Sequence, residues 1–561
     1  MTNNKQKLEL NWIGKDQQPQ LEPRILIEDR EKSFGDRNNQ NMLIHGDNLL
    51  ALKALEQDFN GKIKCIYIDP PYNTGNAFEH YDDCLEHSIW LSLISSRLNF
   101  LWTLLAEDGS LWISIDDDEM PYLRVVMDEL VGRSKFIACN VWQKRYSREN
   151  REAIGDVHEY ILVYAKNPST FKLIRNKVLP TGKQTKVYKN PNNDPKGPWR
   201  SIPMTAQEGH ATPDQFYEIT SPSGKKFKPP TGRCWGLAQR TFEKLLAEGR
   251  IYFGKSGNSQ PNTIRYLSEI EGFVPWTWWP SEEVGHTDEA KKEIHALFGK
   301  IDAFDTPKPE RLINRIIHIA TKPGDIIFDS FLGSGTTAAV AHKMGRKWIG
   351  IELGDHCDTL CLPRLKKVVT GEDQGGISKT ANWKGGGGFN YYYLAPSLLQ
   401  KDKYDNWIID KSYNPEMLAA AMAKHEGFRF NPDEHVFWKQ GQSTEKDFIF
   451  TTTTFVTVEY LDKIQEEMKP EETLLICCKA FQEPCESRFT NINIKKIPHM
   501  LLGRCEFGKD DYSLNIVNVP LENEQEENLD TNSGADIVSE KKISSSRKKD
   551  KKQDTSDPTL F

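Results

Sequence analysis

The segment Asp69-Pro70-Pro71-Tyr72 directly follows a compact apolar run from Ile63 to Ile68. Such a run is typical of a buried parallel strand. Two prolines cannot continue a hydrogen-bonded ladder, so the strand has to end there and its carboxyl end becomes a fixed loop. In an open α/β sheet, ligands bind at the carboxyl ends of the strands. The sequence therefore predicts an α/β fold with a doubly wound sheet and a binding loop at this point.

The residue types in this loop suit a flat ring that carries an exocyclic amine. The lone pair of such an amine is delocalised into the ring, and acceptors that hold its two N–H groups localise that lone pair on nitrogen. The Asp69 carboxylate and the Pro70 carbonyl can both accept, and proline has no N–H with which the loop could satisfy them. Tyr72 would stack on the ring. The alternative is a plain strand-ending turn, because Asp-Pro commonly opens turns.

A second segment, Phe328 to Thr337, contains a glycine turn. It follows a short apolar strand at Asp325 to Ile327 and opens into a helical run from Thr336 to Met344. A strand, a glycine turn and a helix form a nucleotide-binding unit in which the helix N-terminus points at the ligand. The turn lacks the lysine of a phosphate-binding loop and the third glycine of the dinucleotide fingerprint.

Glu352 ends the next predicted strand, Lys347 to Ile351. A carboxylate at that position can accept hydrogen bonds from ribose hydroxyls. Taken alone, such a residue is more often a solvated strand-end acid, but its spacing from the glycine turn favours the ribose role.

Together these motifs resemble those of the DNA amino-methyltransferases that use S-adenosylmethionine (AdoMet). Asp69-Pro70-Pro71-Tyr72 matches the DPPY catalytic motif of that family, and Phe331 to Gly335 matches its FxGxG cofactor motif. The catalytic motif comes first here, which is the circularly permuted order of the β group. The resemblance implies a Rossmann-like methyltransferase sheet whose cofactor is AdoMet.

The resemblance also assigns cofactor contacts. Leu43 to Asn48 resembles the strand end where Asp47 would contact the cofactor adenine, and Thr306 to Leu312 resembles the helix start where Lys308 closes over the methionine end. The expected cofactor-binding residues are Asp47, Lys308, Asp329, Phe331, Gly333, Ser334, Gly335, Thr336 and Glu352, and the expected catalytic residues are Asp69, Pro70, Pro71 and Tyr72.

Within the β group, the chain resembles the modification (Mod) subunit of type III restriction–modification systems. Tyr72 to Gly75, Gly109 to Asp116 and the insert ending at Pro275 to Trp279 support this resemblance. It implies methylation of adenine N6 on a base flipped out of double-stranded DNA, a homodimer, and a helicase–nuclease restriction subunit as partner.

Three other functions stay open. Cytosine-N4 methylation uses the same amine chemistry, although Asp69 in place of serine favours adenine. A non-catalytic DNA-binding subunit could keep the fold, but Asp69, Tyr72 and Gly333 are intact. A dinucleotide oxidoreductase would lack the third glycine and would give DPPY no role.

Composition sets further limits. The formal net charge is −7, yet residues 141–200 carry 13 Lys/Arg against 5 Asp/Glu, which indicates either DNA backbone contact or a solvated basic face. Ten cysteines are scattered, and buried free thiols explain them better than metal ligands, so no metal site is expected. No run of 18 apolar residues exists, so a soluble cytoplasmic protein with no membrane contact is expected.

We expect the chain to divide along its composition shifts. The Trp276, Trp278 and Trp279 cluster is interpreted as a packed domain junction, with a stacking surface as the alternative. The glycine run Gly385 to Gly388 indicates a flexible junction. The predicted parts are a polar N-terminal arm (1–40), a methyltransferase catalytic half (41–166), a target-recognition insert (167–300), a cofactor half (301–370), a linker (371–388), a C-terminal α/β domain for dimerisation or partner docking (389–520) and a disordered tail (521–561).

Overall fold

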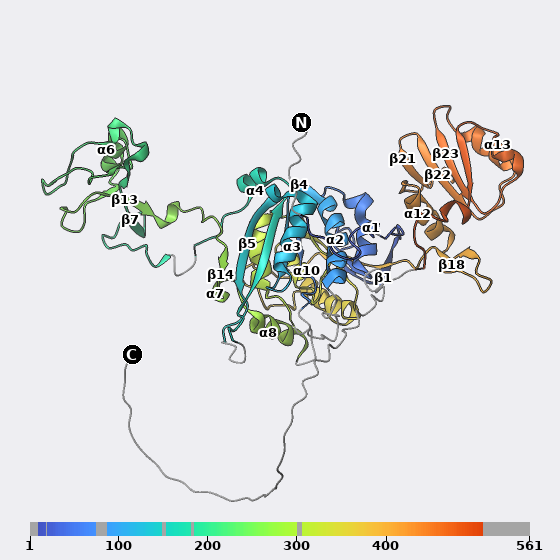
Figure 1. Cartoon of the computed structure of the whole chain (residues 1–561), viewed down its shortest axis with the longest axis horizontal. Helices are drawn as coiled ribbons and strands as arrows, with labels where there is room; N and C mark the ends of the chain where they lie inside the picture. Colours follow the sequence, from blue (N-terminus) through green and yellow to red (C-terminus); the bar gives the residue numbers. More distant parts are fainter. Residues whose placement is uncertain are drawn as a thin grey trace, which may run out of the picture. The chain divides into compact units, whose positions relative to one another are not determined.

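The central part of the chain forms a ten-stranded mixed sheet (Figure 1), and the predicted catalytic motif follows β3 (Ile63–Ile68), one of its inner strands. The computed structural model describes residues 9–17, 19–73, 87–147, 153–180, 185–299 and 306–508. In spatial order the strands are β1 (Leu26–Gly35), β17 (Gly388–Leu394), β2 (Met42–His45), β16 (Lys347–Glu352), β15 (Ile326–Asp329), β3 (Ile63–Ile68), β4 (Leu105–Ile115), β6 (His158–Ala165), β5 (Phe136–Gln143) and β14 (Trp278–Trp279).

The two halves of the chain interleave in this sheet. β15 and β16 lie between β2 and β3, and all four strands run parallel. Phe328 in β15 stands opposite Ile66 in β3. Because parallel strands end at the same edge, the loop after β3 and the glycine turn after β15 become neighbours.

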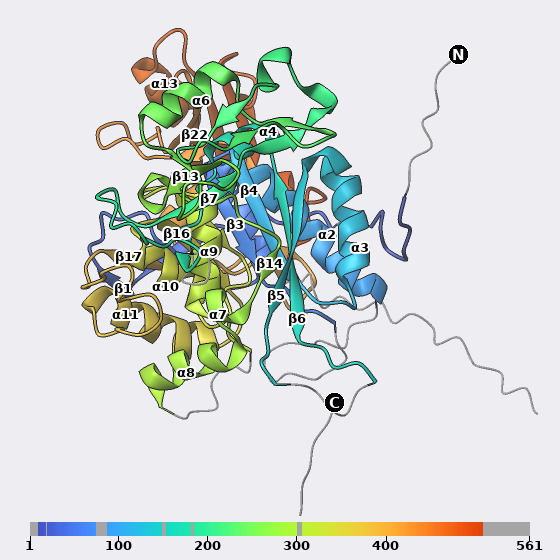
Figure 2. The ribbon, with the colours of Figure 1, turned by 90° about the vertical axis from the view of Figure 1, so that its left-hand side faces the viewer.

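Helices cover both faces of the sheet, as Figure 2 shows for α2 and α3 on one side and α10 and α11 on the other. One buried cluster contains residues of α9, α10 and α11, and the other contains residues of α1, α2 and α3. The bounds are α1 (Asn48–Phe59), α2 (His87–Leu104), α3 (Met120–Met127), α9 (Glu310–Ala320), α10 (Thr336–Lys343) and α11 (Leu362–Thr370). The doubly wound α/β sheet expected from the sequence is confirmed.

The expected insert contains short strands and helices instead of long ones. Around a small core that includes Trp235 and Phe242, α6 (Gln239–Ala247) packs with three small antiparallel sheets. Their strands are β7 (Trp199–Pro203), β8 (Thr205–Gln207), β9 (Ile219–Thr220), β10 (Lys226–Phe227), β11 (Arg233–Trp235), β12 (Ile251–Tyr252) and β13 (Asn262–Tyr266). Three further helices flank the insert: α4 (Pro168–Ile174), α7 (Ser281–Val284) and α8 (Thr287–Phe298).

The tryptophan cluster contains one buried residue and two that are about half exposed. Trp279 is buried in β14, which pairs in parallel with β5, and its ring centroid lies 6.3 Å from that of Trp112. Trp276 and Trp278 are about half exposed, at 51% and 49%. The domain-junction interpretation therefore holds for Trp279 alone.

The C-terminal part contains its own five-stranded sheet. The strands are β20 (Arg429–Phe430), β21 (Gly441–Thr444), β22 (Asp447–Thr452), β23 (Thr473–Cys478) and β24 (Ile492–Lys496), accompanied by α12 (Pro415–His425), α13 (Val458–Glu467) and the hairpin of β18 (Leu399–Lys401) and β19 (Trp407–Ile409). Residues 509–520 of the predicted C-terminal domain and the predicted tail (521–561) lie outside the described residues.

Two boundary predictions are wrong. Residues 26–35, expected in a peripheral arm, form β1, a strand at the edge of the main sheet that pairs antiparallel with β17. β17 pairs on its other side with β2, so the main sheet includes residues assigned to the C-terminal domain. One side of an edge strand is exposed and carries polar residues. The strand therefore lacks the regular apolar pattern by which a strand is predicted from sequence.

Residues 371–388, predicted to be a flexible linker, pack against the rest of the described structure instead. Ile377 in this segment is buried, and Trp383 Nε1 donates to the Val368 carbonyl at 2.8 Å. Gly385 approaches the backbone of Gly371 so closely that a Cβ would lie 2.9 Å from its nitrogen. The glycines here serve close backbone packing.

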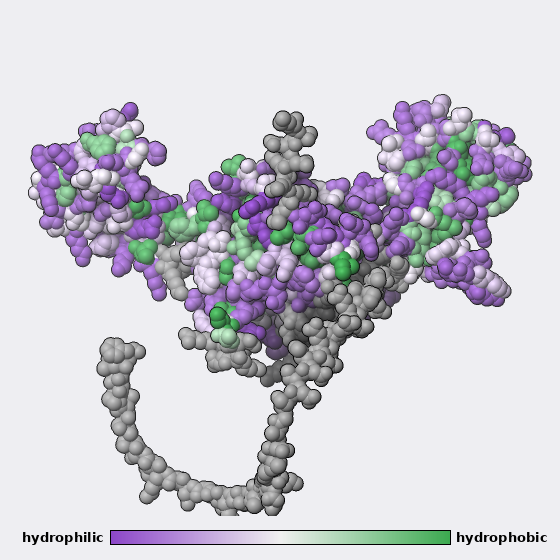
Figure 3. Space-filling model, viewed as in Figure 1, coloured by the Kyte–Doolittle hydropathy of each residue, from purple (hydrophilic) through white to green (hydrophobic). Residues whose placement is uncertain are grey.

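The described chain presents a largely hydrophilic surface with scattered apolar residues (Figure 3). None of the helices in the described ranges is both long enough and apolar enough to cross a membrane.

A buried ion cluster holds the start of α9 in place. Glu310 accepts hydrogen bonds from Lys343 at 2.8 and 2.9 Å and from Arg364 at 3.0 Å. Its second oxygen also accepts from the Ile377 backbone N–H at 3.0 Å. Lys343 pairs in addition with Asp373 at 2.8 Å. One carboxylate thus joins α9, α10, α11 and the segment after α11.

Replacing Glu310 by alanine is expected to destabilise the fold strongly, because it leaves two buried cations without their shared partner. Removing one member of a buried ion pair typically costs about 3–5 kcal/mol. Urea unfolding followed by tryptophan fluorescence measures the loss. Glu271→Ala, which breaks the exposed pair with Lys177, is the control and should leave the transition unchanged. A Glu310→Ala midpoint equal to wild type would contradict the assignment.

Candidate active site

The loop after β3 is held by side chains from distant parts of the chain. Asp69 Oδ1 lies 2.7 Å from the Tyr72 hydroxyl, which donates to it. Trp90 of α2 donates its indole N–H to the Pro71 carbonyl at 2.7 Å. The prolines therefore end the strand, and α2 fixes the direction in which the loop leaves it.

Lys308 reaches this loop from the segment before α9. Its Nζ lies 2.8 Å from Asp69 Oδ2 and 5.1 Å from the centroid of the Tyr72 ring, and the residue is 8% exposed. The resemblance implies a position for Lys308 at the methionine end of a cofactor, whereas the structure places its ammonium beside the carboxylate of Asp69. It thereby joins the two predicted halves of the site.

A second carboxylate, Glu159, completes this cluster. Its Oε2 lies 3.1 Å from the Tyr72 hydroxyl and 3.4 Å from Lys308 Nζ. Glu159 is the second residue of β6, which runs antiparallel to β4, so its start lies at the edge where β3 and β4 end. The sequence analysis did not identify it. An acid inside the otherwise apolar strand HEYILVYA is the signal that could have revealed it.

Burial and charge act against each other in this cluster. Burial raises the pKa of Asp69, and the Lys308 ammonium opposes that rise without cancelling it. Burial alone would lower the pKa of Lys308, but Asp69 and Glu159 outweigh it and raise that pKa above its usual value. Burial and the two carboxylates raise the pKa of Tyr72 well above its ordinary value. The lysine therefore stays charged and the phenol stays protonated.

The glycine turn after β15 has a conformation that requires glycine. Gly333 and Gly335 have φ angles of 55° and 78°, in the left-handed region. The Phe331 N–H donates to Asp329 Oδ1 at 2.9 Å. Arg364 donates to the Ser334 carbonyl at 3.0 Å and to the Thr336 hydroxyl at 2.8 Å, at the start of α10. All of the turn residues predicted for the cofactor thus lie together.

Glu352 is the acceptor that fastens this turn to the next strand. Its Oε2 accepts from the Gly333 N–H at 2.6 Å, and its Oε1 accepts from the backbone N–H groups of Leu353 and Gly354 at 2.8 and 3.1 Å. His356 Nε2 lies 3.0 Å from Oε1. The strand-end position predicted from the sequence is correct, and the carboxylate is buried instead of solvated.

Asp47 caps α1, accepting from the Leu50 N–H at 3.0 Å, and its other oxygen lies 3.6 Å from Arg97. The neighbouring Asn48 donates to the Ser330 carbonyl at 2.8 Å. The turn after β2 and the glycine turn are therefore in direct contact.

Two features of this edge fit a nucleoside cofactor that carries positive charge. Ser330 Oγ is buried and, within the described part of the chain, has no hydrogen-bond partner, so it can bind a polar ligand atom. The ends of β2, β3, β15 and β16 carry the acids Asp47, Asp69, Asp329 and Glu352. Burial raises the pKa of Asp329 to about 7, and the charges of Asp69 and Glu352 add to that rise. A cationic ligand would relieve this repulsion.

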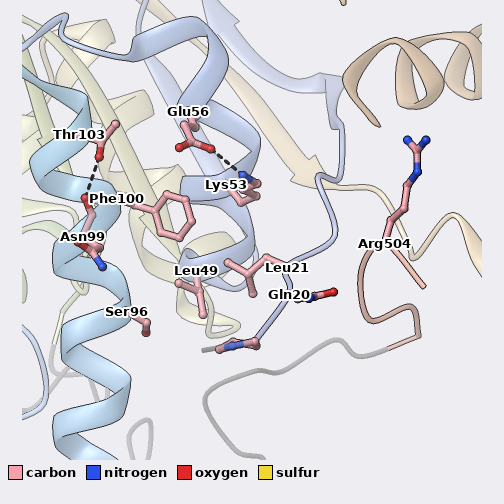
Figure 4. Close-up of a pocket in the computed structure, with 11 residues that line it drawn as sticks. Gln20, Leu21, Leu49, Lys53, Glu56, Ser96, Asn99, Phe100, Thr103 and Arg504 are labelled. Carbon is pink, nitrogen blue, oxygen red and sulfur yellow. Dashed lines mark hydrogen bonds and ion pairs between the residues drawn. The ribbon is translucent and has the colours of Figure 1, made fainter. Parts of the chain in front are cut away.

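A cavity of about 430 Å³ lies elsewhere, along α1 and α2 (Figure 4). Leu49 and Lys53 of α1 and Phe100 of α2 line it, together with Leu21. None of the predicted catalytic or cofactor residues contributes to its lining.

Comparison with known proteins agrees with this geometry. A family model described as DNA methylase matches residues 63–359, which span both the loop after β3 and the glycine turn. The probable type III restriction-modification enzyme HindVI Mod subunit of Haemophilus influenzae is 34% identical over 411 residues, covering 64% of this chain and 54% of the relative. The StyLTI Mod subunit of Salmonella typhimurium is 32% identical over 366 residues, 59% of this chain and 55% of the relative.

The type II methyltransferase M.KpnI of Klebsiella pneumoniae is 30% identical over 328 residues, covering 53% of this chain and 75% of the relative. The chain spans about half the length of the two Mod subunits. Since the family model covers more than half of the residues and includes both motifs, the chain belongs to the DNA methylase family.

Proposed function

We propose that this protein is an AdoMet-dependent DNA methyltransferase that modifies N6 of an adenine flipped out of double-stranded DNA. The observation that carries the proposal is the position of Asp69, at the end of β3 and directly beside the glycine turn that ends β15. An amine held by Asp69 would thus lie next to the cofactor site. Membership of the DNA methylase family supports the same reaction.

The residues of the loop account for activation of the amine. Asp69 and the Pro70 carbonyl accept its two N–H groups and localise the lone pair on nitrogen. The Tyr72 ring stacks on the base, while its hydroxyl stays protonated and holds the carboxylate cluster. When bound, AdoMet supplies a methyl group on a sulfonium, which is transferred to the amine nitrogen as its bond to sulfur breaks. The methylated nitrogen then releases one N–H proton towards Asp69 or water.

Site geometry and desolvation supply most of the acceleration in this scheme. Three acids at the strand ends would hold the cofactor: Glu352 its ribose, Asp47 its adenine and Asp329 its positively charged end. The Ser330 hydroxyl offers a further contact for the ribose. Gly333, Ser334, Gly335 and Thr336 shape the turn against which it lies.

We further propose that the protein is the modification subunit of a type III restriction–modification system and acts in the cytoplasm. The relatives named as Mod subunits support this role. Residues 167–300 would recognise the target sequence, with basic side chains contacting phosphates. The C-terminal part would serve dimerisation or docking of a helicase–nuclease subunit.

Methyl transfer is tested by incubating the protein with tritiated AdoMet and duplex DNA and counting DNA-bound tritium. Asp69→Ala should abolish transfer, since the amine loses its charged acceptor, while AdoMet binding measured by calorimetry remains. Glu372→Ala, which removes an exposed carboxylate, is the matched control and should transfer at the wild-type rate. Wild-type-like transfer by Asp69→Ala would contradict the assigned role, and no transfer by the wild-type protein to any DNA, alone or with a restriction subunit, would contradict the enzyme.

Removing the lysine that contacts Asp69 should shift the pH dependence of the reaction. Asp69 accepts N–H groups best as the carboxylate, so activity falls as the pH drops through its pKa. Burial raises this pKa and Lys308 opposes the rise, so Lys308→Met should raise it further and move the acid limb of the kcat profile to higher pH.

The profile is measured at saturating AdoMet, so that a change in cofactor affinity does not affect it. Lys367→Met, at an exposed position that pairs with Glu372, serves as the control. An acid limb that stays in place or moves to lower pH in Lys308→Met would show that this ammonium does not govern Asp69.

A further inference from the structure

Both carboxylate oxygens of Asp69 are occupied in this structure. Oδ1 accepts from the Tyr72 hydroxyl at 2.7 Å, and Oδ2 faces Lys308 Nζ at 2.8 Å. The exocyclic amine of a target base needs one of these oxygens. A carboxylate oxygen can accept two hydrogen bonds, but the Lys308 ammonium and the Tyr72 hydroxyl compete with the amine for the same lone pairs. The amine therefore binds Asp69 more strongly when one of these donors gives up its contact.

A buried donor that loses its acceptor normally carries a large penalty. An ammonium left without a counter-ion in a buried site costs several kcal/mol, and a buried hydroxyl without an acceptor costs about 1–3 kcal/mol. Exchange at Asp69 therefore requires a second acceptor within reach of the same two groups.

Glu159 meets this requirement. Its Oε2 lies 3.1 Å from the Tyr72 hydroxyl and 3.4 Å from Lys308 Nζ, so each donor already lies between the two acids. Its Oε1 faces Lys144 at 3.6 Å. Glu159 is 8% exposed, so little water competes for these contacts.

We propose that Glu159 is a positioning residue that takes over the donor, the Lys308 ammonium or the Tyr72 hydroxyl, that leaves Asp69 when the amine of the target base binds. This inference rests on the proposed methyltransferase function and adds a residue to it. Glu159 acts through Asp69 and does not itself touch the reacting atoms. Its charge, more than its shape, is the property the exchange uses.

The charges of the cluster support this exchange. Lys308 lies between Asp69 and Glu159, whereas Lys144 pairs with Asp156 at 2.6 Å and faces Glu159 at 3.6 Å, and a neutral base adds no charge to this cluster. Both carboxylates raise the pKa of Lys308, so the ammonium persists when it moves from one to the other. Without the charge of Glu159, Lys308 would have Asp69 as its nearest counter-ion and would compete with the incoming amine.

Two substitutions separate charge from shape. Glu159→Gln keeps the size of the side chain and removes its charge, and Glu159→Asp keeps the charge and shortens the side chain. We expect kcat to fall by about ten-fold or more in Glu159→Gln, the cost of one hydrogen bond to a charged group. We expect KM for AdoMet and for DNA to change by less than about three-fold, because most binding contacts lie elsewhere. Glu159→Asp should retain more activity than Glu159→Gln.

A matched control is available on the same segment. Asp156 contacts Lys144, as Glu159 does, with its Oδ2 2.6 Å from Lys144 Nζ. The Asp156 side chain is 48% exposed. Asp156→Asn removes an acid from this side of the site without affecting Lys308 or Tyr72, and its kcat should equal that of wild type.

The double variant Glu159→Gln/Lys308→Met adds a test of mechanism. With no lysine competing for Asp69, the loss caused by Glu159→Gln should shrink relative to the single variant. Thermal unfolding and AdoMet binding are measured for every variant. If Glu159→Gln does not fold, Glu159→Asp carries the test, with a lower kcat and unchanged KM expected.

Two results of these kinetic measurements would overturn the inference. Glu159→Gln at the wild-type kcat, or more active than Glu159→Asp, would assign Glu159 to packing, and equal losses in both lysine backgrounds would separate it from Lys308. A wild-type protein that methylates no DNA contradicts the proposed function instead, so the two failures are distinguishable.

Discussion

The site depends on the buried contact between Asp69 and Lys308. The two residues lie in different halves of the chain, and the 2.8 Å contact between their charged groups joins the loop after β3 to the segment that begins α9. A buried ion pair is costly to form and costlier to break on one side only. The contact therefore fixes the loop after β3 and the segment before α9 relative to each other.

The surroundings of the pair are arranged to keep both loops still. Glu310, two residues after Lys308, is anchored by Lys343 and Arg364. Glu352 fastens the glycine turn through the Gly333 N–H. Trp90 fixes the loop after β3 through the Pro71 carbonyl. Two of these anchors are buried charged groups and the third is an indole N–H, so the positions of the loops are set before any ligand binds.

The parts of the fold that could be predicted from sequence are those with local signals. Apolar runs ended by proline or glycine located β3 and β15, and the motifs then identified Asp69 and Gly333. β1 could not be predicted from the sequence because an edge strand has mixed polarity. The contacts of Lys308 and Glu159 could not be predicted because their partners are distant in the chain. Which side chains meet is decided by the register of the mixed sheet. The packed segment 371–388 was mistaken for a linker because glycine composition alone does not distinguish flexibility from close backbone approach.

We propose that Asp69 and Tyr72 receive the exocyclic amine of an adenine. The most direct measurement is mass spectrometry of nucleosides digested from DNA that the protein has treated with AdoMet carrying an isotopically labelled methyl group. We expect labelled N6-methyl-2′-deoxyadenosine, which should be absent from DNA treated with the Asp69→Ala variant. Labelled N4-methyl-2′-deoxycytidine would contradict the choice of base, and the absence of any labelled nucleoside would contradict the site itself.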